Sequence, residues 1–476
     1  MKLNKILKKD QIELYVINYA NNFMDPGCLF RNLPYDLQYI IADYNPRSIF
    51  YLLSETDKFD WFKLTKRIFS LDYDKRASTN EQIMKAYLHN CRRRSNIICD
   101  HTHTIIRTRD RRLMISGYRL EDNRFKEIVL PLESDEIIMC FNYTIIKLKD
   151  CTLMRAFPYG YGMSFVPIEK LPRNITQVIS GSYHTIIRFT DGTLMGWGLN
   201  TRGELGLGTL YSPITFEKIF LPTYVVDVTC GINSTFIKLA DGTLMSCGNN
   251  AFGQLGLGLE DNEIRNIFSE IKNIPKTVAK VICWHHSVFI KFEDGTLMSC
   301  GDNHAGQLGL GNNTDKNIFH EIFIPKNIFE VITRGSHTII RLNDGRLMSC
   351  GNNQYGQLGL ADYKSRNLFC DIPGIGTNIV ELACGSHYIV IRMTDGKLMG
   401  CGYNVNGELG LGDYANKNSY QEIRDIPKNI KKVECGPNHT FLELTDGTLM
   451  CSGYNIYGQL GLHHNKTRNT FTAVCL

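Results

Sequence analysis

The chain has 476 residues, of which 43% are hydrophobic and 21% are charged, so it can bury a large core in more than one folding unit. No run approaches the roughly 20 apolar residues of a membrane span, and the charged start of the chain is unlike a secretory signal. The net charge of +5 lies mainly in residues 1–100, which hold 16 Lys and Arg against 12 Asp and Glu. A whole-protein nucleic-acid surface is therefore not expected, and we expect a cytoplasmic or nuclear protein without a membrane partner.

Residues 1–95 lack the repeats of the remaining chain and predict a small α-helical domain. The stretch LFRNLPYDLQYIIADYNPRSIFYLL begins at Leu29, and Pro34 in it stands at a first helical turn before an apolar stripe. Residues 29–70 resemble the F-box, a helical module that docks on the adaptor subunit of cullin-RING ubiquitin ligases. The resemblance implies that the adaptor contacts a short apolar set, namely Leu33, Pro34, Leu37, Ile40 and Ile41. A helical pair that caps the following domain would show the same stripe, so both interpretations stay open.

From residue 96 to residue 476 the chain repeats one unit eight times. Each unit is marked by an aspartate before a short "xLM" run: Asp110, Asp150, Asp191, Asp241, Asp294, Asp344, Asp395 and Asp446. The spacings are 40, 41, 50, 53, 50, 51 and 51 residues, which indicates a stacked repeat architecture. The first two units are shorter and lack the GQLGLG loop, as is typical of terminal repeats.

Within a unit the hydrophobic period is two. The stretch HTIIRFTDGTLMGWG from His184 predicts a strand, a tight Asp-Gly turn and a returning strand. Apolar runs such as those at Val178 and Phe268 supply a first and a fourth strand. The expected fold is mainly β, a β-propeller of seven or eight four-stranded blades. Its structural turn residues are Asp191, Gly192, Asp241, Gly242, Asp294, Gly295, Asp344, Gly345, Asp395, Gly396, Asp446 and Gly447.

The pattern CGPNHTFLELTDGTLM from Cys435, followed by GYNIYGQLGL from Gly453, resembles the regulator of chromosome condensation repeat. That resemblance implies a β-propeller, usually of seven blades, over residues 96–476. The Trp-Gly of the family stands only at Trp197 and Gly198, whereas four other units carry cysteine at the place of the tryptophan, namely Cys247, Cys300, Cys350 and Cys401. Because eight units are present, either the ring has eight blades or one early unit packs outside it.

The polar residues that recur in the repeat units do not follow the pattern of a catalytic or metal site. Histidine stands seven residues before the turn aspartate in four units (His103, His184, His337 and His439), but tyrosine or serine holds that place in the others (Tyr143, Ser234, Ser287 and Tyr388). We therefore expect these histidines to be structural, and we expect no cofactor, no metal and no enzyme activity. The sixteen cysteines lack a CxxC motif, which favours buried residues in a reducing compartment.

The sequence favours a non-catalytic protein-interaction protein. The two resemblances together imply a substrate adaptor of a ubiquitin ligase, with the propeller binding the target. A guanine-nucleotide exchange factor for a Ran-like small GTPase and a plain scaffold are the alternatives. The later spacings of 50 to 53 residues leave no room for an inserted wedge of the kind that displaces a nucleotide. The loops ADYKSRNLF, GDYANKNSY and LEDNEIRNIF look most exposed, and their mixed charge favours a protein partner.

Overall fold

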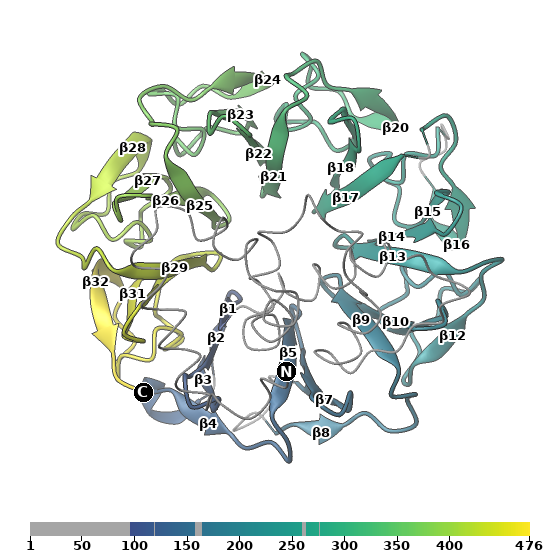
Figure 1. Cartoon of the computed structure of the whole chain (residues 1–476), viewed down its shortest axis with the longest axis horizontal. Coiled ribbons are helices and arrows are strands. Elements are labelled where there is room, and N and C mark those ends of the chain that lie inside the picture. Colours follow the sequence, from purple (N-terminus) through teal and green to yellow (C-terminus); the bar gives the residue numbers. More distant parts are fainter. Residues whose placement is uncertain (1–95, 119, 158–163, 259–262, 276) are drawn as a thin grey trace, which may run out of the picture. The chain divides into compact units, whose positions relative to one another are not determined.

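The computed structural model describes residues 96–476 except residues 119, 158–163, 259–262 and 276. In this part of the chain, eight four-stranded antiparallel sheets stand around a central axis as the blades of a propeller (Figure 1). The predicted mainly-β fold is confirmed, and the number of blades is eight, where the family resemblance alone leads to seven. The predicted helical domain of residues 1–95 lies outside the described residues and stays a prediction.

Each blade consists of four consecutive strands, with the first strand innermost and the fourth outermost (Figure 1). Blade 1 has β1 (Ile97–Cys99), β2 (His103–Arg107), β3 (Leu113–Gly117) and β4 (Lys126–Ile128). Blade 2 has β5 (Ser134–Met139), β6 (Thr144–Leu148), β7 (Leu153–Ala156) and β8 (Val166–Pro167). Blade 3 has β9 (Ile175–Ser180), β10 (His184–Phe189), β11 (Leu194–Gly198) and β12 (Glu217–Ile219). Blade 4 has β13 (Val225–Cys230), β14 (Ser234–Leu239), β15 (Leu244–Gly248) and β16 (Arg265–Glu270).

The second half of the ring repeats this order with longer outer strands. Blade 5 has β17 (Val278–Trp284), β18 (Ser287–Phe292), β19 (Leu297–Gly301) and β20 (Lys316–Glu321). Blade 6 has β21 (Ile328–Arg334), β22 (His337–Leu342), β23 (Leu347–Gly351) and β24 (Arg366–Asp371). Blade 7 has β25 (Ile379–Cys384), β26 (Tyr388–Met393), β27 (Leu398–Gly402) and β28 (Lys417–Ile423). Blade 8 has β29 (Ile430–Cys435), β30 (His439–Leu444), β31 (Leu449–Gly453) and β32 (Arg468–Val474).

Helices contribute almost nothing to the described part of the chain, where one short 3-10 helix, η2 (Glu121–Asn123), is present. Within the same part, no helix has the length and apolarity that crossing a membrane requires. The sequence placed the fourth strand of blade 4 at Phe268, but the strand starts at Arg265. The pairing of Gly248 with Arg265 lies beyond a register shift, so the strand resumes after an irregularity that hydrophobic periodicity does not show.

Eight hydrophobic clusters fill the eight seams between neighbouring blades, and each joins residues of two blades. At the seam of blades 3 and 4, for example, Ile186 and Leu205 pack with Ile237 and the thiol of Cys247. The alternation of apolar residues along each strand serves both faces of a blade, because each blade has two neighbours. The core is therefore a ring of seams.

A polar clamp recurs at the seams. The backbone oxygen of Glu204 in blade 3 accepts hydrogen bonds from Thr235 Oγ1 (2.7 Å) and Cys247 Sγ (3.5 Å) of blade 4. The oxygen of Gln307 in blade 5 likewise accepts bonds from Thr338 Oγ1 (2.9 Å) and Cys350 Sγ (3.4 Å) of blade 6. The cysteines that replace the family's tryptophan thus satisfy buried carbonyl groups between blades.

The ring closes between blade 8 and blade 1 without a strand shared by the two. Arg124 of blade 1 forms an isolated β-bridge with Leu462 of blade 8, of the same kind that joins Leu411 with Thr470 between blades 7 and 8. A cluster that includes Phe125 and Phe441 fills the closing seam. Closure therefore uses the same contacts as an ordinary seam.

Candidate protein-binding face

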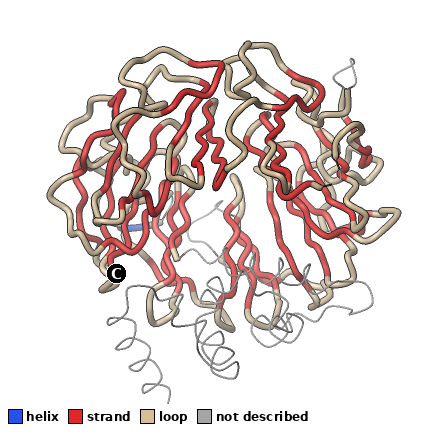
Figure 2. The backbone as a smooth tube through the Cα atoms, turned by 45° about the horizontal axis from the view of Figure 1, so that its top comes forward, coloured by secondary structure: helices blue, strands red, loops and turns tan. Residues whose placement is uncertain are grey.

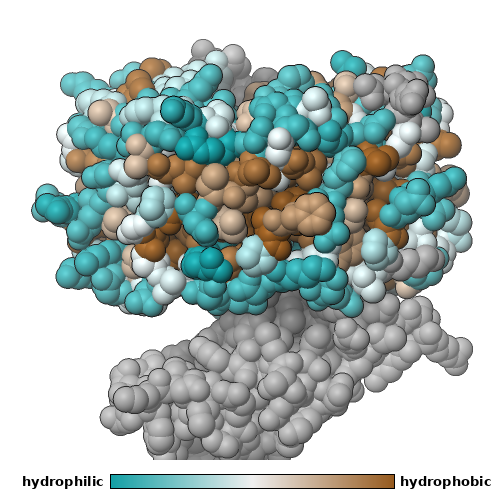
Figure 3. All heavy atoms as spheres, turned by 90° about the horizontal axis from the view of Figure 1, so that it is seen from above, coloured by the Kyte–Doolittle hydropathy of each residue, from teal (hydrophilic) through white to brown (hydrophobic). Residues whose placement is uncertain are grey.

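The antiparallel order of strands gives the propeller two faces. The turns between first and second strands and the loops between third and fourth strands emerge at one end of the blades, which we call the loop face. The turns between second and third strands and the connections between blades emerge at the other end, the turn face. Figure 2 shows the strands rising along the ring with the loops gathered at their two ends. The wall between the faces carries a hydrophobic band between hydrophilic rims (Figure 3).

The Asp and Gly residues predicted as turn residues all lie on the turn face. The six glycines have φ values between +77° and +89°, a region that other residues rarely adopt. The carboxylates are occupied within their own turns: Asp241 Oδ1, for example, accepts a bond from the backbone N–H of Thr243 (2.9 Å). For Asp294, bonds from the N–H and hydroxyl of Thr296 lower the pKa of the carboxyl group. The turn face is therefore a ring of similar, locally satisfied turns.

The predicted adaptor-binding residues Leu33, Pro34, Leu37, Ile40 and Ile41 lie outside the described residues. Their role stays a prediction.

The loop face carries aromatic side chains on the eight turns between first and second strands, which we call the mouth. In blades 1 to 3, the ring of Phe141 lies 6.1 Å from His101 and 5.3 Å from Tyr183, and Phe141 is 59% exposed. These residues occupy the turns between first and second strands. Nothing in the turn geometry fixes the identity of His101 and Phe141, because the equivalent places in blades 7 and 8 hold Ser386 and Pro437.

At two further seams, an aromatic residue from a loop packs on the turn of the next blade. The ring centroids of Phe252 and His286 lie 4.8 Å apart, and those of Tyr355 and His387 lie 5.4 Å apart. At the closing seam, Tyr118 and Tyr457 lie 5.2 Å apart in an edge-on arrangement. Aromatic residues that are held in place but partly exposed are enriched where protein partners bind.

Histidines give the mouth polar groups with little charge. Partial burial lowers the pKa of His285, His286 and His387, so these imidazoles are neutral at neutral pH. The eight first-to-second-strand turns with their flanking residues contain one Lys or Arg, which is Arg334, and one acid, which is Asp100. Asp100 Oδ1 accepts bonds from the N–H groups of Thr102 and His103 (2.6 Å each). The mouth of the loop face is thus aromatic and nearly uncharged.

Three residues of blade 5 on the loop face have metal-ligating side chains within 4.8 Å of one another, namely Asp302, His304 and Asp315. Each carboxylate also accepts a backbone bond: Asp302 from His304 N (3.1 Å) and Asp315 from Asn303 N (2.9 Å). The hydrogen bond to Asp302 and the charge of Asp315 raise the pKa of His304. These hydrogen bonds and charges explain the three residues as a surface ion-pair cluster that holds the loop in place.

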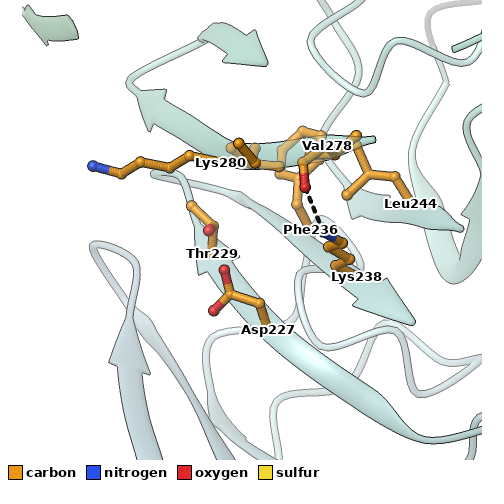
Figure 4. A pocket seen from close by; sticks show the side chains of 9 residues that line it. Asp227, Thr229, Phe236, Lys238, Leu244, Val278 and Lys280 are labelled. Carbon is orange, nitrogen blue, oxygen red and sulfur yellow. Dashed lines mark hydrogen bonds between the residues drawn. The ribbon is translucent and has the colours of Figure 1, made fainter. Parts of the chain in front are cut away.

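Two hollows in the described residues are small. One, of about 10 Å³, lies between blades 4 and 5, where Figure 4 shows Lys238 bonded to the backbone oxygen of Val278 beside Asp227 and Lys280. The other, of about 160 Å³, lies at the closing seam and includes Asn96, Glu443 and Leu476 in its lining. Small-molecule sites typically measure about 300–1,000 Å³, so neither hollow favours a small ligand.

The histidines that the sequence assigned a structural role lie at the start of second strands. His184 Nε2 lies 2.9 Å from Thr235 Oγ1, and His439 Nε2 lies 3.1 Å from Thr104 Oγ1, each across a seam. For these two histidines the partner is a hydroxyl group of the next blade, whereas His103 Nε2 lies 3.1 Å from the backbone oxygen of Tyr118 in its own blade. Sequence reasoning missed the turn residues of the loop face, because they share no motif. Their variability, in contrast to the Asp-Gly turns that six units share, is the feature that could have identified them.

Comparison with known proteins supports the repeat assignment. Two family models described as "Regulator of chromosome condensation (RCC1) repeat" match the chain, one at residues 175–204, 225–254 and 430–459 and the other at residues 344–391 and 395–442. Human "X-linked retinitis pigmentosa GTPase regulator" is 33% identical over 96 residues, which are 20% of this chain and 9% of that protein. "Ultraviolet-B receptor UVR8" of Arabidopsis thaliana is 38% identical over 95 residues, 20% of this chain and 21% of that protein. The chain thus matches less than a quarter of each of these relatives.

Solved structures agree on the fold. Human WBSCR16 superposes with a TM-score of 0.54 at 23% identity, covering 67% of this chain and 88% of that one. Prp20p of Saccharomyces cerevisiae, whose structure was described with its binding to Gsp1p and histones, gives a TM-score of 0.53 at 20% identity over 66% of this chain and 80% of that one. The structure therefore shows that residues 96–476 form an eight-bladed propeller, and the family models show that the matched residues in blades 3, 4, 6, 7 and 8 carry regulator of chromosome condensation repeats.

Proposed function

We propose that this protein is a non-catalytic adaptor whose loop face captures a protein target. The observation that carries the proposal is the aromatic and histidine rim of the mouth, in which Phe141 is exposed and Tyr183 and Trp284 are partly buried. Interfaces concentrate their binding energy in such aromatic residues, and a nearly uncharged rim favours a folded or peptide partner over a polyanion. The small hollows are consistent with a surface that binds without turning over a small substrate.

The test uses photo-crosslinking from each face. A photoreactive phenylalanine analogue replaces Phe141 on the loop face or Phe323 on the turn face, where the side chain is 93% exposed. We expect a defined protein to be crosslinked from position 141 and not from position 323. Equal capture from both positions, or capture from position 323 alone, would contradict the loop face as the binding surface.

We further propose that residues 29–70 link the captured target to a cullin-RING ubiquitin ligase in the cytoplasm or nucleus. The support is the resemblance of these residues to the F-box. The test is a pull-down of the ligase adaptor subunit with the full chain and with a Leu37→Ala, Ile41→Ala double variant. The double variant should lose the adaptor and keep the crosslink from position 141. No binding by the wild type would reduce the protein to a target-binding scaffold.

Guanine-nucleotide exchange on a Ran-like GTPase is the second candidate, and the fold shared with Prp20p supports it. The assay measures release of a fluorescent nucleotide from such a GTPase in the presence of the full chain. We expect no acceleration. If the full chain clearly accelerates release and the loop-face variant Phe141→Ala does not, nucleotide exchange becomes the preferred function.

A further inference from the structure

One sector of the loop face differs from the rest because its polar groups have few partners. It is formed by Trp284 of blade 5, Arg334 and His337 of blade 6, and His387 of blade 7, whose inner strands are neighbours in Figure 1. Four buried polar atoms there have no hydrogen-bond partner among the described residues: Trp284 Nε1, His387 Nδ1 and both ring nitrogens of His337. Buried polar atoms of this kind usually have partners, so this concentration indicates a site of unmet hydrogen bonding.

The lack of a partner for His337 has a structural cause. At two other seams the equivalent histidine meets a threonine hydroxyl of the next blade, as His184 meets Thr235. Blade 7 carries Ile389 at that place, so an apolar side chain stands where the hydroxyl would be. His337 is 1% exposed, and burial lowers its pKa to about 3, so its imidazole is neutral.

Arg334 is the cation of this sector. Its guanidinium carbon lies 3.9 Å from the centre of the Trp284 ring, so the group lies against the indole. No hydrogen bond or ion pair joins the Arg334 side chain to another described residue. Contact through the face of a guanidinium leaves its N–H edge free, and that edge matches the two oxygens of a carboxylate.

His387 stands next to Arg334 and adds a second polar group. A Cβ atom built on Gly335, the residue after Arg334, would lie 3.3 Å from Cε1 and 3.4 Å from Nδ1 of His387. The His387 ring also contacts the ring of Tyr355, with centroids 5.4 Å apart. Arg334 is therefore bordered by aromatic groups and a neutral imidazole, with no second cation in the eight mouth turns.

We propose that Arg334, resting on Trp284 and flanked by His387, binds an Asp or Glu side chain of the protein partner. The inference rests on the proposed function, because it names the chemistry by which the loop face recognises its target. A single guanidinium among aromatic groups fits one carboxylate next to apolar residues. A nucleic acid would require several cations along its phosphates, which these turns do not supply.

The first experiment defines the ligand with a random-peptide phage library panned on the immobilised full chain. We expect peptides that combine an acidic residue with apolar neighbours, and we expect this enrichment to vanish on Arg334→Gln. The matched control is Arg346→Gln on the turn face, where Arg346 pairs with Asp344 at 2.9 Å. Peptides without acidic residues, no acidic enrichment on the wild type, or equal enrichment on Arg334→Gln would overturn the proposal.

The second experiment is a double-mutant cycle with one selected peptide and its Asp→Asn or Glu→Gln counterpart, measured by fluorescence anisotropy. Arg334→Gln should weaken binding of the acidic peptide by about tenfold to a hundredfold and leave the amide peptide unchanged. Arg334→Lys keeps the charge but loses the two-pronged geometry, so it should recover part of the affinity. Equal losses for both peptides would overturn the carboxylate assignment.

Two further readouts separate this inference from its alternatives. If the crosslink from position 141 persists in Arg334→Gln and the acidic peptides still bind, the loop face stands as a target surface and the Arg334 site falls. If a labelled single-stranded oligonucleotide binds through Arg334 and acidic peptides do not, the sector recognises phosphate and the proposal is wrong. Thermal unfolding of each variant shows that a loss of binding is not a loss of fold.

Discussion

The two faces of the propeller are built from the same strands but obey different constraints. On the turn face every well-formed unit repeats Asp-Gly, because the chain must reverse with φ near +80° and the aspartate must bond the N–H two residues later. On the loop face the turns between first and second strands hold residues as different as Phe141, Trp284 and Pro437. These residues lie in turns where neither a single turn type nor the core limits the side chain. The repeated face therefore serves folding, and the variable face is the one available for recognition.

The largest expected effect tests the constraint on the turn face. Gly295 and the loop-face Gly412 share a φ of +85°, but a Cβ on Gly295 would lie 1.9 Å from the backbone oxygen of Lys326, whereas one on Gly412 would meet nothing within 4 Å. We expect Gly295→Ala to destabilise by about 3 kcal/mol and Gly412→Ala by about 1 kcal/mol, in denaturant unfolding. Ala361, with φ +62°, already occupies the place equivalent to Gly412 in blade 6. Equal losses would show that the clash does not distinguish the faces.

The next effect concerns recognition. A Phe141→Ala, Tyr183→Ala double variant removes one exposed and one partly buried aromatic side chain from the loop face, so the affinity for the crosslinked partner should fall by about 2 kcal/mol, roughly thirtyfold. The control is Phe220→Ala, which removes a side chain that is 84% exposed between blades 3 and 4 on the turn face. Titration calorimetry measures both. A loss of affinity in the control as large as in the double variant would remove the functional distinction between the faces.

The smallest expected effect depends on pH and concerns Glu408, a buried glutamate in a loop of the loop face. Glu408 stands where blades 4, 5, 6 and 8 have glutamine, and burial raises its pKa to about 7 from 4.5. The folded protein thus holds a proton that the unfolded chain releases, so the contribution of Glu408 to stability is full below about pH 4.5 and is lost as pH rises through about 7. Glu408→Gln should therefore stabilise by about 1–2 kcal/mol at about pH 8 and have little effect at about pH 4.

Chemical denaturation at both pH values measures this difference, with Glu422→Gln of the outer strand β28 as an exposed control. Asn406 Nδ2 donates a hydrogen bond of 2.7 Å to Glu408 Oε1. The amide oxygen of a glutamine at position 408 can accept the same hydrogen bond. Destabilisation by Glu408→Gln at about pH 8 would mean that this bond outweighs the cost of burying the charge.

The sequence by itself determined the repeat, the four strands of each unit and the Asp-Gly turns, because these are local properties. Period-two alternation and a glycine that tolerates positive φ can be read within about fifteen residues of any unit. The limits of local reading appear at β16, whose start at Arg265 follows a register shift that no periodicity marks. The resemblance to the F-box is also local, and its residues lie outside the described part of the chain.

Only the tertiary structure decided the number of blades and the composition of the loop face. The ring closes with eight blades because the angles between neighbouring blades add up to a full circle. This sum depends on all eight seams, so no single repeat unit determines it. The sector of Arg334 arises in the same way, since Trp284, Arg334 and His387 lie about fifty residues apart in sequence, each one unit from the next. The repeat places them on neighbouring blades, and the ring brings their side chains together.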